Sequence, residues 1–395
     1  MRRSALVLGL LLTLACRPER SGLAAGEPLP ARRSRLAVAE TLRGGETEGF
    51  ALALAPRAFR FPADHGPHPE FRTEWWYYTG NLATREGRRF GFQLTFFRQA
   101  LVAHPPERRS PWAASQVYLA HFTLTDVQAR SFRSFERLER GAQGLAGAVA
   151  SPFRVWVGDW ASRGQGPDAP PFHLIARAPL EEPAEPGQEV AVDLELSPGK
   201  PIVAQGDRGL SRKGDLPGQA TYYYSLPRLP AAGTVRDGRA SYPVSGLAWM
   251  DREWGTSSLG SDQVGWDWFS LQLDDGRDLM LYRLRQRDGG TAPASAGTLI
   301  AQDGASRPLR IAPGTIEPLG SWTSPRSAAR YPAAFHLRLP AEGLDLTVRP
   351  LLADQELDTS FLYWEGAVEV TGSVGGRGYV ELTGYSHGDT REAER

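Results

Sequence analysis

The sequence predicts an all-β protein that consists of two similar domains of antiparallel strands. Apolar and polar residues alternate in many short runs, including residues 190–196, 335–339 and 379–385, and this period of two is typical of half-buried strands. Gly, Pro, Asp and Asn separate the runs, and short strands with frequent turn residues favour barrels or sandwiches. The length of 395 residues is sufficient for two cores.

The first 16 residues resemble a bacterial export signal with a lipidation site. Two arginines precede an apolar run over residues 5–15, which is too short for a bilayer span of about 20 residues. The run ends at Cys16, the only cysteine, in "LLTLAC", which is similar to a lipobox. We expect Cys16 to be lipidated and to anchor the exported protein to a periplasm-facing membrane surface. Arg17 favours the outer membrane, and secretion without an anchor is the alternative.

Residues 17–46 are expected to form a flexible linker, because they are rich in Arg, Ala, Gly and Pro and lack regular apolar spacing. Beyond the linker, "FRSFERLERG" at residues 132–141 is the one segment that indicates a helix. The 45 basic and 45 acidic side chains of the chain balance. No overall field therefore favours nucleic acid, and we expect no nucleic-acid partner.

A repeated aromatic hairpin indicates that the two domains are related. "WWYYTGNLATREGRRFGFQLTFFR" at residues 75–98 and "WDWFSLQLDDGRDLMLYRLR" at residues 266–285 both begin with aromatic residues and have an acidic residue and a glycine at the turn. An acidic residue followed by Gly between alternating runs is a hairpin signal. We therefore predict two similar β-domains, over residues 47–243 and 244–395, that arose by duplication. A chance similarity of two hairpins is the alternative.

The stretch "EWWYYTGNL" at residues 74–82 carries aromatic side chains on both faces of a predicted strand. Alternate side chains of a strand point to opposite faces, so Trp75 and Tyr77 share one face and the residues beside them share the other. Such a strand either packs in a core on both faces or lines a ligand cavity on one of them. "TYYYSLPRL" at residues 221–229 allows the same alternatives. The residues that we expect to bind a hydrophobic ligand are Glu74, Trp76, Tyr78, Tyr223, Trp254, Trp266 and Trp268.

The densest group of charged and aromatic residues is "AWMDREWG" at residues 248–255. In an extended segment Asp251 and Glu253 share one face, while Arg252 and Trp254 share the other. Two carboxyl groups on one face raise each other's pKa, and burial raises it further, so one of them is a candidate catalytic acid. A structural ion pair with an arginine is the alternative.

His121, in "YLAHFTLTD", lies among apolar residues of a predicted strand. We name it as a third candidate catalytic residue, although a hydrogen-bonded core histidine is the simpler interpretation. His65 and His68 lie near Asp64 and Glu70, but no further spaced ligands accompany them, so we expect no metal site. The sequence has no phosphate-binding loop and no dinucleotide fingerprint, and we expect no cofactor.

Several aromatic-rich segments together resemble the AttH and carotenoid 1,2-hydratase family of lipocalin-like proteins. The resemblance extends from Phe61 to Tyr385, with the segments in the same order. It implies two lipocalin-like (calycin) antiparallel β-barrel domains in tandem. The segments are "EWWYYTGNL", "FGFQLTFFR", "AHFTLTD", "YYYSLPRL", "AWMDREWG", "GWDWFSLQLDDG" and "YWEGAVEVTG" followed by "GYVELTGY".

The hydratases of this family add water across a terminal isoprenoid double bond. The resemblance implies that Asp251 or Glu253 protonates the alkene and that nearby rings stabilise the carbocation, namely Tyr223, Trp254, Trp266 and Trp268. The hydratases carry a His near the position of Arg252 and an acidic residue on the strand that here reads "LYRLR" (residues 281–285), and this chain has neither. It is closer to the AttH-like branch. A non-catalytic carrier of a hydrophobic ligand in the cell envelope is therefore the alternative function.

Overall fold

The computed structural model describes residues 47–106, 110–180, 187–257 and 259–385, and regular structure within these ranges is almost entirely β. The all-β prediction is therefore confirmed. The helical segments found there are two 3-10 helices, η1 (Ala63–His65) and η2 (Pro340–Glu342), and neither has the length and hydrophobicity needed to span a bilayer. Cys16 and the rest of the expected signal and linker lie outside the described residues.

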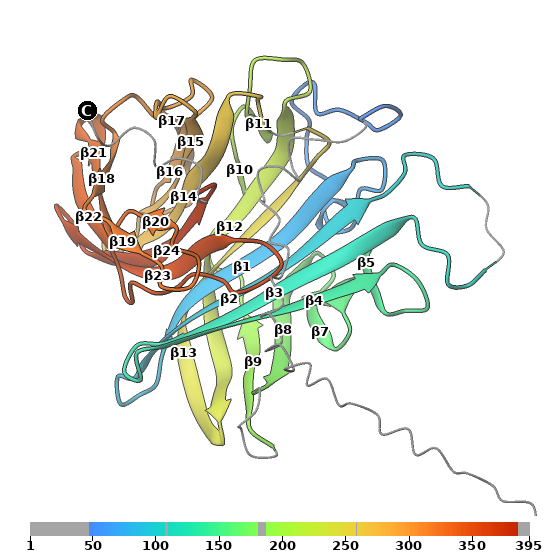
Figure 1. Cartoon of the computed structure of the whole chain (residues 1–395), viewed down its shortest axis with the longest axis horizontal. Coiled ribbons are helices and arrows are strands. Elements are labelled where there is room, and N and C mark those ends of the chain that lie inside the picture. Colours follow the sequence, from blue (N-terminus) through green and yellow to red (C-terminus); the bar gives the residue numbers. More distant parts are fainter. Residues whose placement is uncertain (1–46, 107–109, 181–186, 258, 386–395) are drawn as a thin grey trace, which may run out of the picture. The chain divides into compact units, whose positions relative to one another are not determined.

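The first sheet has 13 strands and curls into a nearly closed barrel (Figure 1). The strands are β1 (Thr73–Ala83), β2 (Arg89–Ala100), β3 (Gln116–Asp126), β4 (Ser131–Arg140), β5 (Ala146–Ala150), β6 (Phe153–Val157), β7 (Trp160–Gly166), β8 (Ala169–Pro179), β9 (Glu189–Leu196), β10 (Val203–Ala204), β11 (Leu210–Arg212), β12 (Ala220–Gly238) and β13 (Ala240–Gly255). Their order is β4-β3-β2-β1-β13-β12-β9-β8-β7-β6-β5, and β10 and β11 pair with β12. The edge strand β4 also contacts β6, which brings the two edges of the sheet together.

The second sheet has nine strands and forms a half-barrel (Figure 1). Its strands are β14 (Gln263–Leu273), β15 (Asp278–Gln286), β16 (Ala296–Ile300), β17 (Ser306–Arg310), β18 (Ile316–Leu319), β21 (Ala334–Leu339), β22 (Leu344–Pro350), β23 (Tyr363–Gly372) and β24 (Gly376–Thr383), and β19 (Trp322–Thr323) pairs separately with β20 (Arg330–Tyr331). The sheet order is β17-β16-β15-β14-β24-β23-β22-β21-β18. The two barrel-type sheets follow one another in the chain, as predicted. The first sheet extends to Gly255, past the boundary expected at residue 243, because β13 pairs with both β1 and β12.

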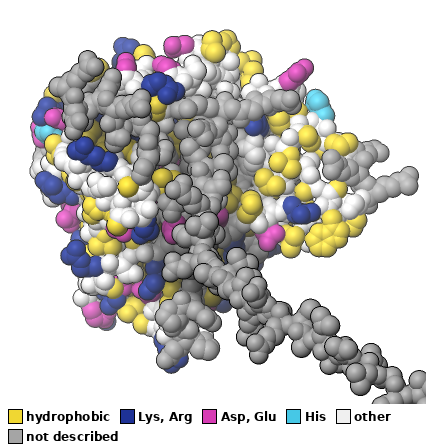
Figure 2. All heavy atoms as spheres, in the orientation of Figure 1, with side chains coloured by type: hydrophobic (Ala, Val, Ile, Leu, Met, Phe, Trp, Pro, Cys, Tyr) yellow, Lys and Arg dark blue, Asp and Glu magenta, His cyan; other side chains and the backbone are white. Residues whose placement is uncertain are grey.

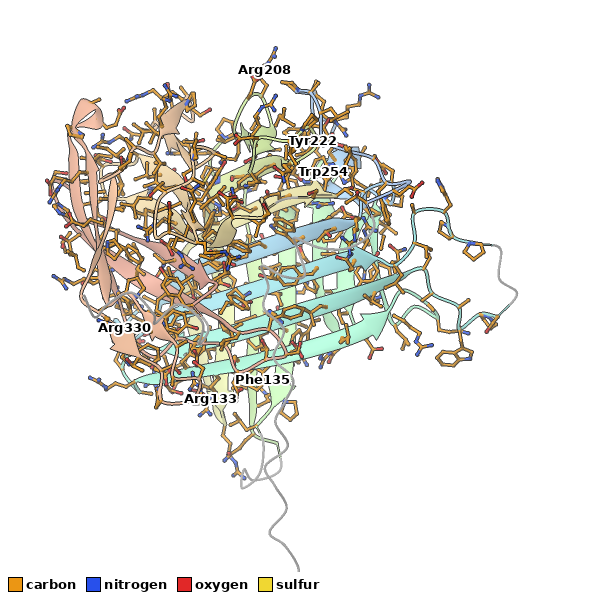
Figure 3. All side chains as sticks on the ribbon, turned by 45° about the horizontal axis from the view of Figure 1, so that its top comes forward. Arg133, Phe135, Arg208, Tyr222, Trp254 and Arg330 are labelled. Carbon is orange, nitrogen blue, oxygen red and sulfur yellow. The ribbon has the colours of Figure 1, made fainter. Side chains whose placement is uncertain are left out.

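Both predicted hairpins are present, as β1–β2 and β14–β15. Their turns contain Gly87 at φ +87° and Gly276 at φ +85°, a backbone conformation that favours glycine. The helix indicated over residues 132–141 is wrong, because this segment forms the edge strand β4 and pairs with β3. Phe135 of β4 (Figure 3) stacks on Phe122 with ring centroids 5.8 Å apart, so packing against the barrel core determines its conformation.

The wall that consists of β1, β2, β3, β12 and β13 is buried on both faces. Its inner face packs in the barrel core, where Trp76 and Tyr78 are fully buried. Its outer face meets the second sheet, and there Asn81 Nδ2 donates a hydrogen bond to the carbonyl of Gly378 at 3.0 Å. Each large apolar side chain buried in this way contributes about 1.5–3 kcal/mol. Burial on two sides explains why this wall carries aromatic residues at successive positions.

Candidate functional site

A cavity of about 450 Å³ lies between the outer face of this wall and the second sheet. Its volume is within the range of small-molecule pockets, about 300–1,000 Å³. Apolar and aromatic side chains from both sheets line most of it, and four carboxyl groups face it. The aromatic side chains in the lining include Trp75, Tyr77, Tyr223, Trp266, Trp268 and Tyr363.

The face of β1 that lines the cavity is the opposite of the one that we predicted. Trp75 and Tyr77 face the cavity, whereas Glu74, Trp76 and Tyr78 are fully buried inside the barrel. These last three residues, which we predicted to bind the ligand, therefore lie outside this cavity. The period of the sequence predicts which residues share a face, but the curvature of the sheet decides which face becomes the interior of the barrel.

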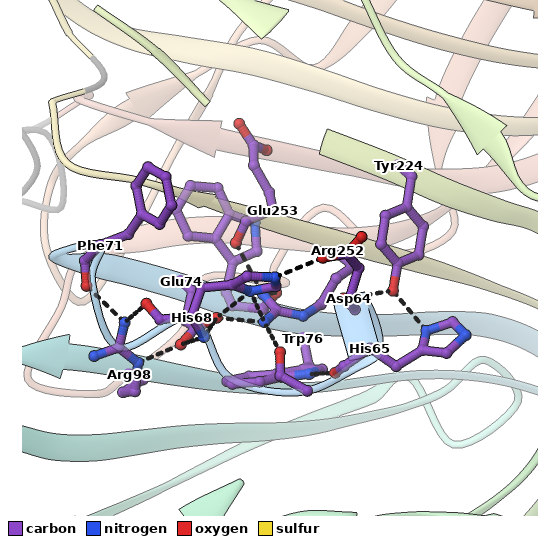
Figure 4. A network of polar contacts seen from close by, with 12 residues as sticks. Asp64, His65, His68, Phe71, Glu74, Trp76, Arg98, Tyr224, Arg252 and Glu253 are labelled. Atoms are coloured by element: carbon purple, nitrogen blue, oxygen red, sulfur yellow. Dashed lines mark hydrogen bonds and ion pairs between the residues drawn. The ribbon is translucent and has the colours of Figure 1, made fainter. Parts of the chain in front are cut away.

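Glu74 belongs to a buried ion-pair network inside the barrel (Figure 4). Its carboxylate accepts hydrogen bonds from Arg98 Nε and Arg252 Nη2, and from the backbone N–H of His68 at 3.0 Å. Burial alone would raise the pKa of Glu74, but Arg252 and Arg98 lower it below its usual range. Trp254 stacks on the His68 ring with centroids 3.8 Å apart. Trp254, which we also predicted to bind the ligand, therefore lies outside the cavity and faces the barrel core with Arg252.

Asp251 accepts three hydrogen bonds in the cavity wall. Trp249 Nε1–H donates to Oδ1 at 2.7 Å, the Ser225 hydroxyl donates to Oδ1 at 2.5 Å, and the Tyr223 hydroxyl donates to Oδ2 at 2.5 Å. Tyr223 is a donor here because its oxygen accepts the Nε1–H of Trp268 at 3.1 Å. Burial raises the pKa of Asp251 to about 7, and the three donors oppose a further rise because they favour the carboxylate.

Glu253 forms an ion pair with Lys213 in the same cavity. Its Oε1 lies 3.2 Å from Lys213 Nζ and also accepts a hydrogen bond from the Thr221 hydroxyl. Burial would lower the pKa of Lys213, but the charge of Glu253 raises it above its ordinary value. We conclude that both partners are ionised. The neighbouring Arg252 points into the barrel, so the expected alternative of an ion pair between Arg252 and the cavity carboxylates does not occur.

Two further carboxyl groups, Glu365 and Glu381, enter the cavity from the second sheet and were not predicted from the sequence. They are directly opposite each other on β23 and β24. Burial raises the pKa of Glu365 well above its usual range, and repulsion from Glu381 raises it further. Burial raises the pKa of Glu381 to about 8, with Glu253 and Asp251 adding to the shift. Both glutamates are therefore mainly neutral acids at pH 7, and the Tyr77 hydroxyl bonds to Glu365.

A sequence signal for these two glutamates exists. In "YWEGAVEV" (residues 363–370) and "YVELT" (residues 379–383), each glutamate shares a strand face with a tyrosine, while the opposite face is apolar. "EWWYY" (residues 74–78), which we did single out, likewise places a glutamate on the same strand face as aromatic residues. A search for a glutamate on the same face as a tyrosine, in a strand whose other face is apolar, would have found both residues.

His121 lines the cavity, as does the pair that we predicted to be catalytic, Asp251 and Glu253. Its Nδ1 bonds to the Tyr363 hydroxyl at 2.7 Å and its Nε2 to Glu136 Oε2 at 3.1 Å. Both ring nitrogens therefore have partners, and His121 orients Tyr363 at the cavity wall. Within the described residues, no group of three or more His, Cys, Asp and Glu could hold a metal ion.

Residues 52–385 match the family model of AttH-like proteins. The solved structure of a protein of Nitrosomonas europaea described as an AttH is similar, with 35% identity and a TM-score of 0.72, covering 85% of this chain and 100% of that one. Kievitone hydratase of Nectria haematococca shares the fold at 15% identity and a TM-score of 0.61, covering 87% of this chain and 98% of that one. No curated protein sequence matches the chain.

Proposed function

This chain belongs to the AttH-like family, and from its family and its enclosed carboxyl groups we propose that it binds a hydrophobic, isoprenoid-like small molecule and adds water across a C=C bond. The ligand would lie in the cavity between the two sheets. The name of one relative of the same fold, kievitone hydratase, is in keeping with such a reaction.

The observation that carries the proposal is the presence of a neutral acid and a hydrogen-bonded carboxylate on opposite walls of one apolar cavity. Glu365 and Glu381 hold protons near neutral pH, whereas three hydrogen-bond donors keep the raised pKa of Asp251 at about 7, so that a part of this group is the carboxylate. In many active sites, different environments give two carboxyl groups different pKa values, so that one serves as the acid and the other as the base. A carrier of an apolar ligand gains nothing from buried acids, because each one costs desolvation energy.

The reaction would begin with transfer of a proton from Glu381 or Glu365 to the less substituted carbon of the double bond, whose π electrons form the new C–H bond. The resulting carbocation would face the rings of Trp266 and Trp268, because the faces of aromatic rings attract cations. A water molecule would then form the C–O bond and release a proton to the Asp251 carboxylate. This proton returns to the ionised glutamate before the next turnover.

This assignment differs from the role expected from the sequence, in which Asp251 or Glu253 was the proton donor. Glu253 is paired with Lys213, and an ionised carboxylate has no proton to give. Asp251 accepts hydrogen bonds from three donors, which suits a proton acceptor. The second sheet supplies the acids instead, through Glu365 and Glu381.

Substitution of the acids and the base tests the proposal. The purified protein and its Glu365→Gln, Glu381→Gln and Asp251→Asn variants are incubated with geraniol and farnesol, and mass spectrometry detects products heavier by one water. We expect loss of the acid or base to lower turnover about 10²–10⁴-fold, while binding, followed by tryptophan fluorescence, is retained. Wild-type protein that binds these alkenes without hydrating them would refute catalysis and leave the carrier function. Hydration by all three variants at the wild-type rate would refute the assigned roles.

We further propose that the protein is exported and held at a membrane by a lipid on Cys16. The support is the short apolar run that ends at the only cysteine of the chain. A membrane-attached protein would be close to the phase in which isoprenoid-like molecules dissolve.

A further inference from the structure

The cavity reaches the protein surface at Leu138, which lines it and is exposed. This opening lies near the ends of the strands that lead into the β2–β3 loop, which is described over residues 101–106 and 110–115. The other halves of β1 and β2 are covered by the second sheet, where Asn81 bonds to Gly378. The cavity lining includes Thr73 at the start of β1, and Gln99 and Val117, each one residue inside the loop-proximal end of its strand.

Exposed apolar side chains gather at this opening. We define the rim as Leu101, Val102, Trp112 and Leu138, whose exposed fractions are 55%, 40%, 56% and 64%. Leu138 lines the cavity, and Arg140, two residues further along the same strand, donates a hydrogen bond to the Trp112 carbonyl at 3.4 Å. Figure 2 shows hydrophobic side chains gathered on the right-hand side of the molecule, the side of the β2–β3 loop in Figure 1.

Single exposed apolar residues are ordinary on protein surfaces. The rim is different because it contains four of the eight large hydrophobic side chains that are exposed among the described residues. Leu138 is part of the cavity lining, and the other three lie in the adjoining β2–β3 loop. Grouped exposed apolar residues mark protein–protein or membrane interaction sites. A tryptophan with an exposed ring is typical of the second kind, since its apolar ring and polar N–H suit the interface between lipid and water.

We propose that the rim docks on the surface of a phospholipid bilayer and that a hydrophobic ligand passes from the bilayer into the cavity. The inference rests on the proposed function in one respect, the apolar nature of the ligand. Such a ligand dissolves in lipid far better than in water. An opening pressed against the bilayer lets it reach the cavity without crossing water.

The position of the first described residues favours a bilayer over a protein as the occupant. Gly49 lies against the β2–β3 loop, so that a Cβ atom there would be 2.9 Å from Ala103 Cβ. The linker expected over residues 17–46 therefore reaches the described chain beside the rim. If Cys16 is lipidated and residues 17–46 behave as the linker that the sequence predicts, they would span about 30 Å on average, a length that keeps the rim within reach of the membrane.

A fluorescent probe beside Trp112 tests docking. The full chain has one cysteine, so in the Cys16→Ser background the Ser110→Cys variant carries a single thiol for the environment-sensitive label NBD. We expect its emission to shift to the blue when phosphatidylcholine vesicles are added. The matched control is Arg330→Cys in the same background, because Arg330 is exposed on β20 and lies on the other side of the molecule (Figure 3). Its label should not respond to vesicles.

Rim variants complete the test. In the labelled Ser110→Cys protein, Trp112→Ser should weaken vesicle binding at least about tenfold, and Trp112→Phe should restore most of it. Binding of geraniol supplied in solution should be unchanged, so failure of docking can be told apart from failure of the proposed function. Three results would overturn the inference: no response at position 110, an equal response at position 330, or a response that follows protein concentration without vesicles and so reports a second copy at the rim.

Discussion

The stability of the protein should fall as the pH rises from 6.5 to 8, and Glu381→Gln should remove part of that fall. Burial raises the pKa of Glu381 from its ordinary 4.5 to about 8. Between these two values the folded state holds a proton that the unfolded chain has released. The free energy of unfolding therefore decreases as pH rises, because the unfolded state binds fewer protons.

The size of the effect follows from the two pKa values. For a group with pKa 4.5 unfolded and about 8 folded, linkage gives a loss of about 2 kcal/mol between pH 6.5 and 8. Asp251, raised from 3.8 to about 7, adds about 1 kcal/mol over the same window. Groups of the opposite sign act mainly at lower pH: burial lowers the pKa of His65 from 6.5 to about 3, so stability increases with pH between those values.

Urea unfolding followed by tryptophan fluorescence at pH 6.5 and pH 8 measures this difference. We expect the wild-type protein to lose about 2 kcal/mol more than Glu381→Gln does. Glu365, whose pKa burial also raises, adds a loss of the same sign to both proteins. Glu369→Gln is the matched control, since Glu369 is an exposed residue of the neighbouring strand β23, and it should behave as the wild type does. A wild-type stability that stays constant or rises over this window would show that the cavity acids are not neutral. Equal losses in the wild type and Glu381→Gln would show that the proton is held elsewhere.

Three further predictions concern other parts of the molecule. Lys213→Met should cost about 3–5 kcal/mol because it leaves Glu253 buried without its partner; urea unfolding should show partial recovery when Glu253→Gln is added, and no recovery would contradict the ion pair. Cys16→Ser should move the protein from the membrane fraction to the soluble fraction on cell fractionation, and unchanged distribution would refute lipidation. Trp76→Ala should cost about 3–5 kcal/mol in the barrel core, whereas Trp75→Ala should mainly weaken geraniol binding; the reverse pattern would place the ligand inside the barrel.

Much of the fold could be predicted because it depends on local sequence. Alternating residues predicted the strands, and an acidic residue with Gly87 or Gly276 predicted the two hairpins. The helix prediction over residues 132–141 failed because apolar residues recur there at a helix-like spacing, at Phe132, Phe135 and Leu138. Pairing with β3 holds these residues in a strand, an example of tertiary contacts overriding local preference.

The candidate site was less predictable because it depends on how the two sheets meet. Asp251 and Glu253 were found, since they lie two residues apart in one extended segment. Glu365 and Glu381 lie more than 100 residues further along the chain, and only the contact between the sheets brings them to the same cavity. Nor could local sequence show that Trp75, rather than Trp76, faces this cavity.

The division of the carboxyl groups between two sheets makes the proposed chemistry a property of their interface. The acids Glu365 and Glu381 belong to the second sheet, and the acceptor Asp251 belongs to the first. Neither sheet contains both, so a proton can be delivered and collected only where the two are held together. Buried ion pairs between the sheets can keep them together, because separating a pair would leave a buried charge without its partner.

Asp278 of β15 is the centre of such a contact. It is fully buried, and its carboxylate lies 2.6 Å from Lys200 Nζ and 2.7 Å from Arg228 Nη2, both from the part of the chain that precedes the second sheet. Two cations from one side and one carboxylate from the other fix the relative position of the sheets more narrowly than apolar contacts do, because charge-assisted hydrogen bonds depend on direction. Residues that line no part of the cavity therefore help to set the distance between acid and base across it, together with contacts between the sheets in the lining, such as the hydrogen bond from Trp268 to Tyr223.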